Sequence, residues 1–69
     1  MPLTLAPIGT PSAIRKITGK DDVRQHLAEL GFVAGQEVTV VSSLNGNLII
    51  NVKGSRIALD ETMARRVML

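Results

Sequence analysis

Two segments, 37–43 and 47–53, flank the dipeptide Asn45-Gly46, and each carries apolar residues at every second position, Val38 and Val40 in the first and Leu48, Ile50 and Val52 in the second. Alternation with a period of two is typical of a strand that buries one face, and Asn-Gly between two such runs is a strong signal for a hairpin turn. These residues therefore predict an antiparallel hairpin. The fold has to be completed around it, because a chain of 69 residues is long enough for only one core.

The length of the hairpin loop decides which apolar side chains share a face. A two-residue loop would pair Val41 with Ile50 and would leave Val38 and Val40 on the face opposite the apolar residues of the second strand. A three-residue loop over residues 44–46 pairs Val40 with Ile50 instead, which adds one apolar side chain to the shared face and gives Gly46 a left-handed conformation. The sequence therefore predicts the three-residue loop.

The best helix signal lies in residues 21–30, where Val23, Leu27 and Leu30 recur at helical spacing and two aspartates stand at the start. Gly31 follows and is expected at the left-handed position that ends a helix. Residues 3–11 contain too many turn residues for a regular element. The other predicted elements are a strand at 12–17, a tight turn at 53–55, a strand at 56–59, a helix of one to two turns after Asp60, and a strand at 67–69. This β-α-β-β-β-α-β order predicts one mostly β domain over residues 1–69, a closed or nearly closed small barrel with short helices.

Composition excludes several classes of protein. The chain has no cysteine, which removes disulfides, thiolate zinc sites and cysteine nucleophiles. A hydrophobic fraction of 45% is too high for a disordered chain. The net charge of +2 and the single aromatic residue, Phe32, are a weak basis for nucleic-acid binding. Such binding is the least favoured function here.

Residues for catalysis or membrane insertion are scarce. The chain has one histidine and no nucleophile motif, and Gly19-Lys20 is followed by Asp21 rather than the Ser or Thr of a phosphate-binding loop. We therefore expect no enzymatic activity. No apolar run is long enough to span a bilayer and no signal peptide is visible, so the expected compartment is the cytoplasm.

Glycines and aliphatic residues recur at fixed spacings along nearly the whole chain. The segments are Leu27-x-x-Leu30-Gly31-Phe32-x-x-Gly35-x-x-Val38-x-Val40, Gly46-x-Leu48-x-Ile50-x-Val52-x-Gly54-x-x-x-Ala58-Leu59, and the closing Ala64, Val67 and Met68, with Ile14 and Ile17 upstream. This pattern resembles the ferrous iron transport protein A (FeoA) family. Two turn positions depart from it, because Ala34 and Asn47 stand where the family often has proline.

This resemblance implies a small SH3-like β-barrel in the bacterial cytoplasm. The family works beside the membrane transporter for ferrous iron, which carries a cytoplasmic G-protein domain, and a related module ends the iron-dependent repressors. The implied function is an accessory or regulatory protein that binds this transporter, through which it would be recruited to the inner face of the membrane. The alternative is a metal-binding or metal-sensing module of the repressor type.

A weak metal site is one reading of the predicted helix. Asp22, His26 and Glu29 recur along one side of it, and an imidazole with two carboxylates is an acceptable ligand set for Fe(II) or Zn(II). The alternative is a solvated helix face in which Asp22 interacts with the helix dipole. No cofactor is expected to be required.

A partner-binding surface is the other candidate site. In the three-residue-loop register Val41 and Ile49 point away from the core, and Leu44 lies at the hairpin tip, so these three side chains can form an apolar docking patch. The alternative is that a terminal segment covers Val41 and Ile49. Phe32 is expected in the core. The basic residues could face an acidic partner or anionic lipid headgroups, although a solvated face is the favoured interpretation. These residues are Arg15, Lys16, Lys20, Arg24, Arg65 and Arg66.

Overall fold

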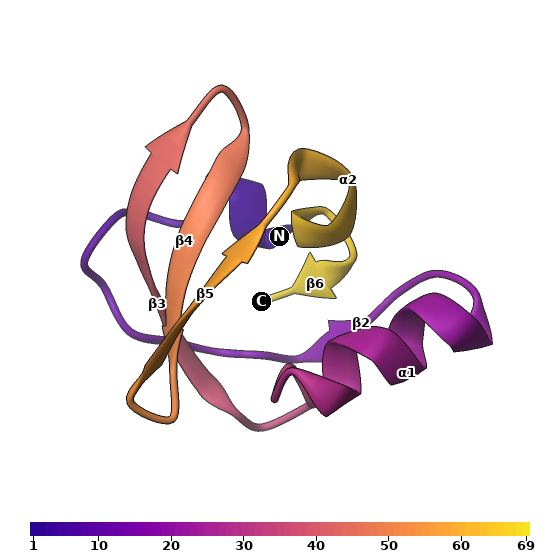
Figure 1. Ribbon diagram of the computed structural model, residues 1–69. Coiled ribbons are helices and arrows are strands. Elements are labelled where there is room, and N and C mark those ends of the chain that lie inside the picture. The colour runs from indigo at the N-terminus through magenta and orange to yellow at the C-terminus, as the bar shows by residue number, and fades with distance from the viewer.

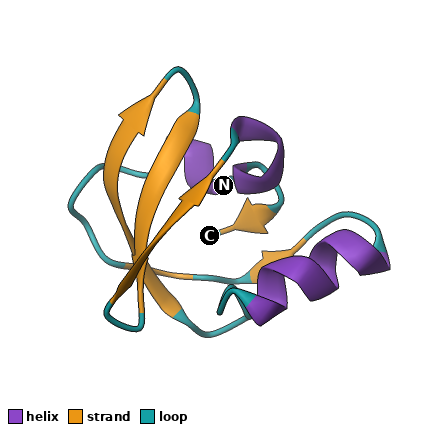
Figure 2. Ribbon diagram, viewed as in Figure 1, coloured by secondary structure: helices purple, strands orange, loops and turns teal.

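The computed structural model describes all residues, 1–69, and most of its regular elements are strands (Figures 1 and 2). The mostly β fold with short helices is confirmed. In chain order the elements are the 3-10 helix η1 (Leu3–Leu5), β1 (Ser12–Ala13), β2 (Lys16–Ile17), α1 (Asp21–Glu29), β3 (Glu37–Leu44), β4 (Asn47–Val52), β5 (Ser55–Leu59), α2 (Glu61–Ala64) and β6 (Val67–Met68).

The strands form two antiparallel sheets. Strands β1-β3-β4-β5 make one sheet in that order, and β2 pairs with β6 in the other. The amino terminus extends the smaller sheet, because Pro2 bridges to Met68 and the Leu69 N–H donates to the Met1 carbonyl oxygen at 2.7 Å. Both chain ends therefore lie beside β6 (Figure 1). Since β5 pairs only with β4, the hydrogen-bonded wall of the barrel is open on that side.

The hairpin has the predicted register but reaches it differently. Val40 pairs with Ile50, as expected, yet Leu44 pairs with Asn47, so the loop has two residues and the predicted three-residue loop is wrong. Asn45 and Gly46 both have positive φ, at 53° and 83°, as a tight two-residue turn requires. The register shifts at Val41, where a β-bulge takes up the extra residue. The bulge lets the favoured turn and the favoured apolar pairing coexist.

The strand predicted at 12–17 is divided in two. Ser12 pairs with Val38 of the larger sheet, whereas Lys16 pairs with Met68 of the smaller one. Between them Ile14 is buried, and its N–H donates to the Gln36 carbonyl oxygen at 2.9 Å. The segment therefore passes from the larger sheet to the smaller one between Ala13 and Lys16.

Helix α1 ends in hydrogen bonds that a left-handed glycine permits. Gly31 has φ of 102°, its N–H donates to Ala28 at 3.0 Å, and the Phe32 N–H donates to Leu27 at 2.9 Å. These two bonds are the Schellman arrangement, and Phe32 and Leu27 also supply its usual apolar contact, because both are fully buried. The expected role of Gly31 is confirmed.

The end of the chain follows the prediction closely. Lys53 and Gly54 form the tight turn into β5, with φ of 52° and 80°. Asp60 caps α2 by accepting the Met63 N–H on Oδ1 at 2.9 Å. The turn rests on backbone conformation and the cap on one side-chain hydrogen bond, and both involve residues only a few positions apart.

Twelve buried apolar residues form one core cluster. The expected burial of Phe32 is confirmed, and it is 0% exposed. Leu3 is 1% exposed, so the lead-in, in which no regular element was predicted, contributes a short 3-10 helix and a core side chain. The cluster consists of Leu3, Ile14, Leu27, Phe32, Val38, Val40, Leu48, Ile50, Val52, Leu59, Ala64 and Val67.

Candidate functional site

A surface pocket of about 320 Å³ lies between α1, β2 and the turn after α1. Gly31 reverses the chain there, and Phe32 then packs under the helix with no exposed surface of its own. Five of the seven lining residues are hydrophobic. The lining residues are Lys16, Ile17, Arg24, Ala28, Phe32, Val33 and Ala34.

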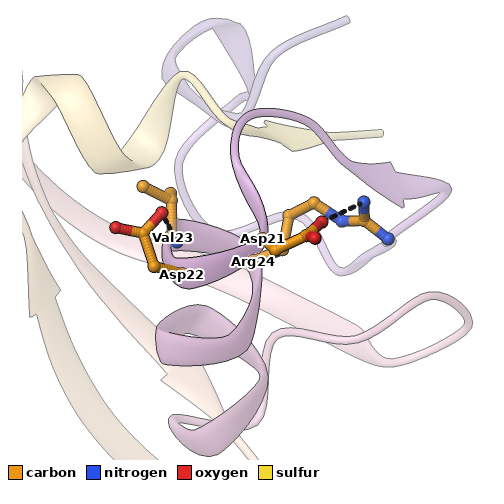
Figure 3. A network of polar contacts seen from close by, with 4 residues as sticks. All are labelled: Asp21, Asp22, Val23 and Arg24. Atoms are coloured by element: carbon orange, nitrogen blue, oxygen red, sulfur yellow. Dashed lines mark hydrogen bonds and ion pairs between the residues drawn. The ribbon is translucent and has the colours of Figure 1, made fainter.

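Two cations are the polar part of this pocket. Arg24 forms an ion pair with Asp21 at 3.3 Å across one turn of α1 (Figure 3), and both side chains are exposed. An exposed pair of this kind contributes little to stability and leaves the arginine free to exchange partners. Lys16 takes part in no ion pair. The pocket therefore combines an apolar floor with positive charge.

The basic residues singled out in the sequence are distributed over more than one surface. Lys16 and Arg24 meet at the pocket. Arg65 pairs with Glu61 on α2, whereas the Cδ of Arg66 lies 3.5 Å from where a Cβ on Gly19 would stand. The aliphatic part of Arg66 thus covers the loop before α1.

The three candidate metal ligands are exposed on α1. Asp22 accepts the Val23 N–H on Oδ1 at 2.9 Å (Figure 3), so one of its oxygens already serves the first turn of the helix. Asp22, His26 and Glu29 are not brought together, since no group of three or more metal-ligating side chains occurs in the chain. Metal binding on this helix face stays a prediction.

The three candidate docking residues lie on the β3–β4 hairpin. Leu44 is 73% exposed, the highest value among the large exposed hydrophobic residues. Val41, the bulge residue, and Ile49 are half-buried. The lead-in approaches β3 here, because the Gly9 N–H donates to the Val40 carbonyl oxygen at 2.8 Å. The patch formed by Val41, Leu44 and Ile49 is called the hairpin patch below.

The pocket is the feature that reading the sequence missed. The sequence indicated that Lys16 and Arg24 are basic residues and that Phe32 and Val33 lie in a turn. It did not predict that these residues line one pocket. Pairing of β2 with β6 and the Schellman turn after α1 position these residues, and only the turn, through Gly31, has a signal in the local sequence. No helix of the structure is long and apolar enough to cross a membrane.

The whole chain, residues 1–69, matches the family model described as the FeoA domain. A relative from Methanocaldococcus jannaschii, named "Putative Fe(2+) transport protein A", is 32% identical over 68 residues, which cover 99% of this chain and 83% of the relative.

Two solved structures share the fold closely. A crystal structure of an iron uptake regulatory protein, FeoA, superposes with a TM-score of 0.89 at 31% identity, covering 97% of this chain and 91% of the other. Stenotrophomonas maltophilia FeoA, complexed with zinc and described as a prokaryotic SH3 domain protein, gives 0.84 at 31% identity, covering 99% of this chain and 87% of the other. The expected SH3-like fold is confirmed.

Proposed function

The chain belongs to the FeoA domain family, and from this membership we propose that it is a small accessory protein of a ferrous iron uptake system. It acts in the cytoplasm by binding the membrane transporter for ferrous iron and is not itself a catalyst. The observation that carries the proposal is the match of residues 1–69 to the family.

The hairpin patch is the proposed docking surface. An exposed leucine at a hairpin tip gains free energy when a partner covers it, and the half-buried Val41 and Ile49 extend the apolar contact. The tip of the β3–β4 hairpin, where Leu44 lies, is remote from α1, which lines the pocket (Figure 1). The two surfaces can therefore be tested separately.

Replacing Leu44 with aspartate is expected to weaken transporter binding by about tenfold or more, because it introduces a charge into the apolar contact. The measurement is a ¹⁵N amide spectrum of the protein titrated with the cytoplasmic G domain of the transporter, with and without a GTP analogue. Wild-type signals of Val41, Leu44 and Ile49 should shift.

Leu5 provides the matched control, because it is an exposed leucine, at 67%, outside the hairpin. Leu5→Asp should bind like the wild type. Shifts confined to the pocket residues Lys16, Arg24 and Val33 would move the docking surface to α1. No shift with either nucleotide state would contradict the proposed function itself.

Metal binding is the second candidate, favoured by the zinc in the Stenotrophomonas maltophilia structure. Zn²⁺ is expected to shift the amide signals around His26 weakly, because the helix presents two or three ligands that are not gathered into a site. His26→Ala should abolish these shifts, and Gln25→Ala, an exposed neighbour on the same helix, should not. A spectrum unchanged by Zn²⁺ or Fe²⁺ would rule out the metal site.

A further inference from the structure

The two long edges of the larger sheet differ in what covers them. Along the outer edge of β3, Val38 pairs with Ser12 of β1, and the Val40 carbonyl oxygen accepts the Gly9 N–H at 2.8 Å. Strand β5 pairs only with β4 and has no neighbour on its other side. The edge of β5 is therefore uncovered along its whole length, whereas β3 has neighbours on its outer edge as far as Val40.

The hairpin geometry shows which backbone groups lie on that edge. The two-residue turn at Lys53-Gly54 makes Val52 and Ser55 a pair that exchanges both hydrogen bonds. Such pairs alternate along an antiparallel ladder, so Ile57 and Leu59 also bond to β4. The N–H and C=O groups of the two residues between them, Arg56 and Ala58, point away from the sheet.

These four backbone groups have no partner within the chain. The backbone hydrogen bonds made outside the helices and ladders include neither Arg56 nor Ala58, and no side chain donates to them or accepts from them. Both residues are exposed. An unpaired, accessible strand edge of this kind is a template for a further strand.

We propose that the β5 edge is an interface at which a second copy of this chain adds its own β5 in antiparallel orientation. With Ile57 of both copies on the two-fold axis, Arg56 of each copy stands opposite Ala58 of the other. The backbone N–H and C=O groups of Arg56 and Ala58 point outward, so each of the two Arg56–Ala58 pairs across the interface exchanges two hydrogen bonds. The arrangement is self-complementary, as a two-fold interface must be.

The side chains suit the same register. Arg56 takes part in no ion pair within the chain and would face a small alanine directly across the interface. Asp60 follows β5 in extended conformation, with φ of −74° and ψ of 169°, which places it diagonally from Arg56 of the second copy. In this register Arg56 of one copy is also diagonal to Arg56 of the other copy. The carboxylate of Asp60 offsets the repulsion between these two guanidinium groups.

The interface is small and the dimer is expected to form reversibly. Strand β5 has five residues and carries a charged side chain, both of which limit edge pairing. An interface built on one five-residue strand from each copy falls at the low end of the areas that specific interfaces bury, so the dimer fraction should depend on protein concentration. The inference does not depend on the proposed transporter partner.

The test exploits the fact that the Ala58 N–H is not used by β4. Proline in place of Ala58 removes an outward donor and adds a ring at the interface while leaving the ladder to β4 intact, as proline on an edge strand does. Sedimentation of the wild type should show an average mass that rises toward twice 7.4 kDa with concentration. Ala58→Pro should remain monomeric, whereas Ala58→Val, which keeps the N–H, should dimerise like the wild type.

Amide hydrogen exchange of the wild-type protein provides a test that needs no variant. The Arg56 and Ala58 amides should exchange about tenfold more slowly in concentrated than in dilute solution, while the Ile57 amide changes much less. A wild type that stays monomeric up to its solubility limit would overturn the proposal. So would a dimer in which Arg56 and Ala58 keep the exchange rates of the monomer.

Discussion

Replacing Phe32 with alanine is expected to lower the free energy of unfolding by about 3–5 kcal/mol, the usual cost of deleting a buried phenylalanine. Phe32 is fully buried, is the only aromatic residue of the chain, and supplies the apolar contact that ends α1. A domain of 69 residues has a total stability of roughly 3–10 kcal/mol. The variant should therefore lose a large part of its stability, and its midpoint in a urea titration followed by circular dichroism should fall accordingly.

Val33 is the matched control for this measurement. It follows Phe32 in the same turn and lines the same pocket, but its side chain is 40% exposed. Val33→Ala should change the free energy of unfolding by about 0.5 kcal/mol or less. A loss below about 1 kcal/mol for Phe32→Ala would show that the aliphatic core closes around the missing ring, contrary to the expected cavity.

Replacing Gly31 with alanine is expected to produce the second large effect, for two additive reasons. A left-handed conformation costs a residue with a Cβ about 1–2 kcal/mol, and Gly31 has φ of 102°. A Cβ at this position would also stand 3.1 Å from Cγ1 of Val52, which is buried and has little room to move. The urea midpoint should fall accordingly.

Gly35→Ala separates the two contributions. Gly35 also has positive φ, at 88°, but a Cβ there would meet nothing within 4 Å. This variant should lose only the backbone contribution, so Gly31→Ala should be the less stable of the two. Equal losses would mean that the contact with Val52 relaxes without cost.

The hairpin shows how a sequence pattern can predict the pairing and miss the path to it. Matching apolar faces predicted that Val40 opposes Ile50, and the structure agrees. The loop length was wrong because the prediction assumed an unbroken ladder between the turn and that pair. The bulge at Val41 makes the length of the turn independent of the register of the strands. Asn45-Gly46 therefore keeps its preferred tight turn and Val40 still pairs with Ile50.

Some features of the candidate sites could likewise be predicted from the sequence, whereas others exist only in the folded chain. The exposure of Leu44 could be predicted from its place at a turn, since turns lie at the surface. Metal-ligating residues at helical spacing share a helix face, but their gathering into a site depends on neighbours that the spacing does not describe. The pocket beside α1 joins residues from β2, α1 and the turn after it, so only the folded chain contains it.

The sequence by itself determined the features in which neighbouring residues decide the outcome. The positions of α1 and α2, the places at which the chain turns at Asn45-Gly46 and Lys53-Gly54, the glycine that ends α1 and the aspartate that caps α2 all depend on backbone preference or on hydrogen bonds spanning a few residues. Only the tertiary structure decided that Leu3 enters the core, that residues 12–17 divide between two sheets, and that the β5 edge stays uncovered. These outcomes depend on which distant segments compete for the same apolar surface and the same backbone groups, and no local pattern records that competition.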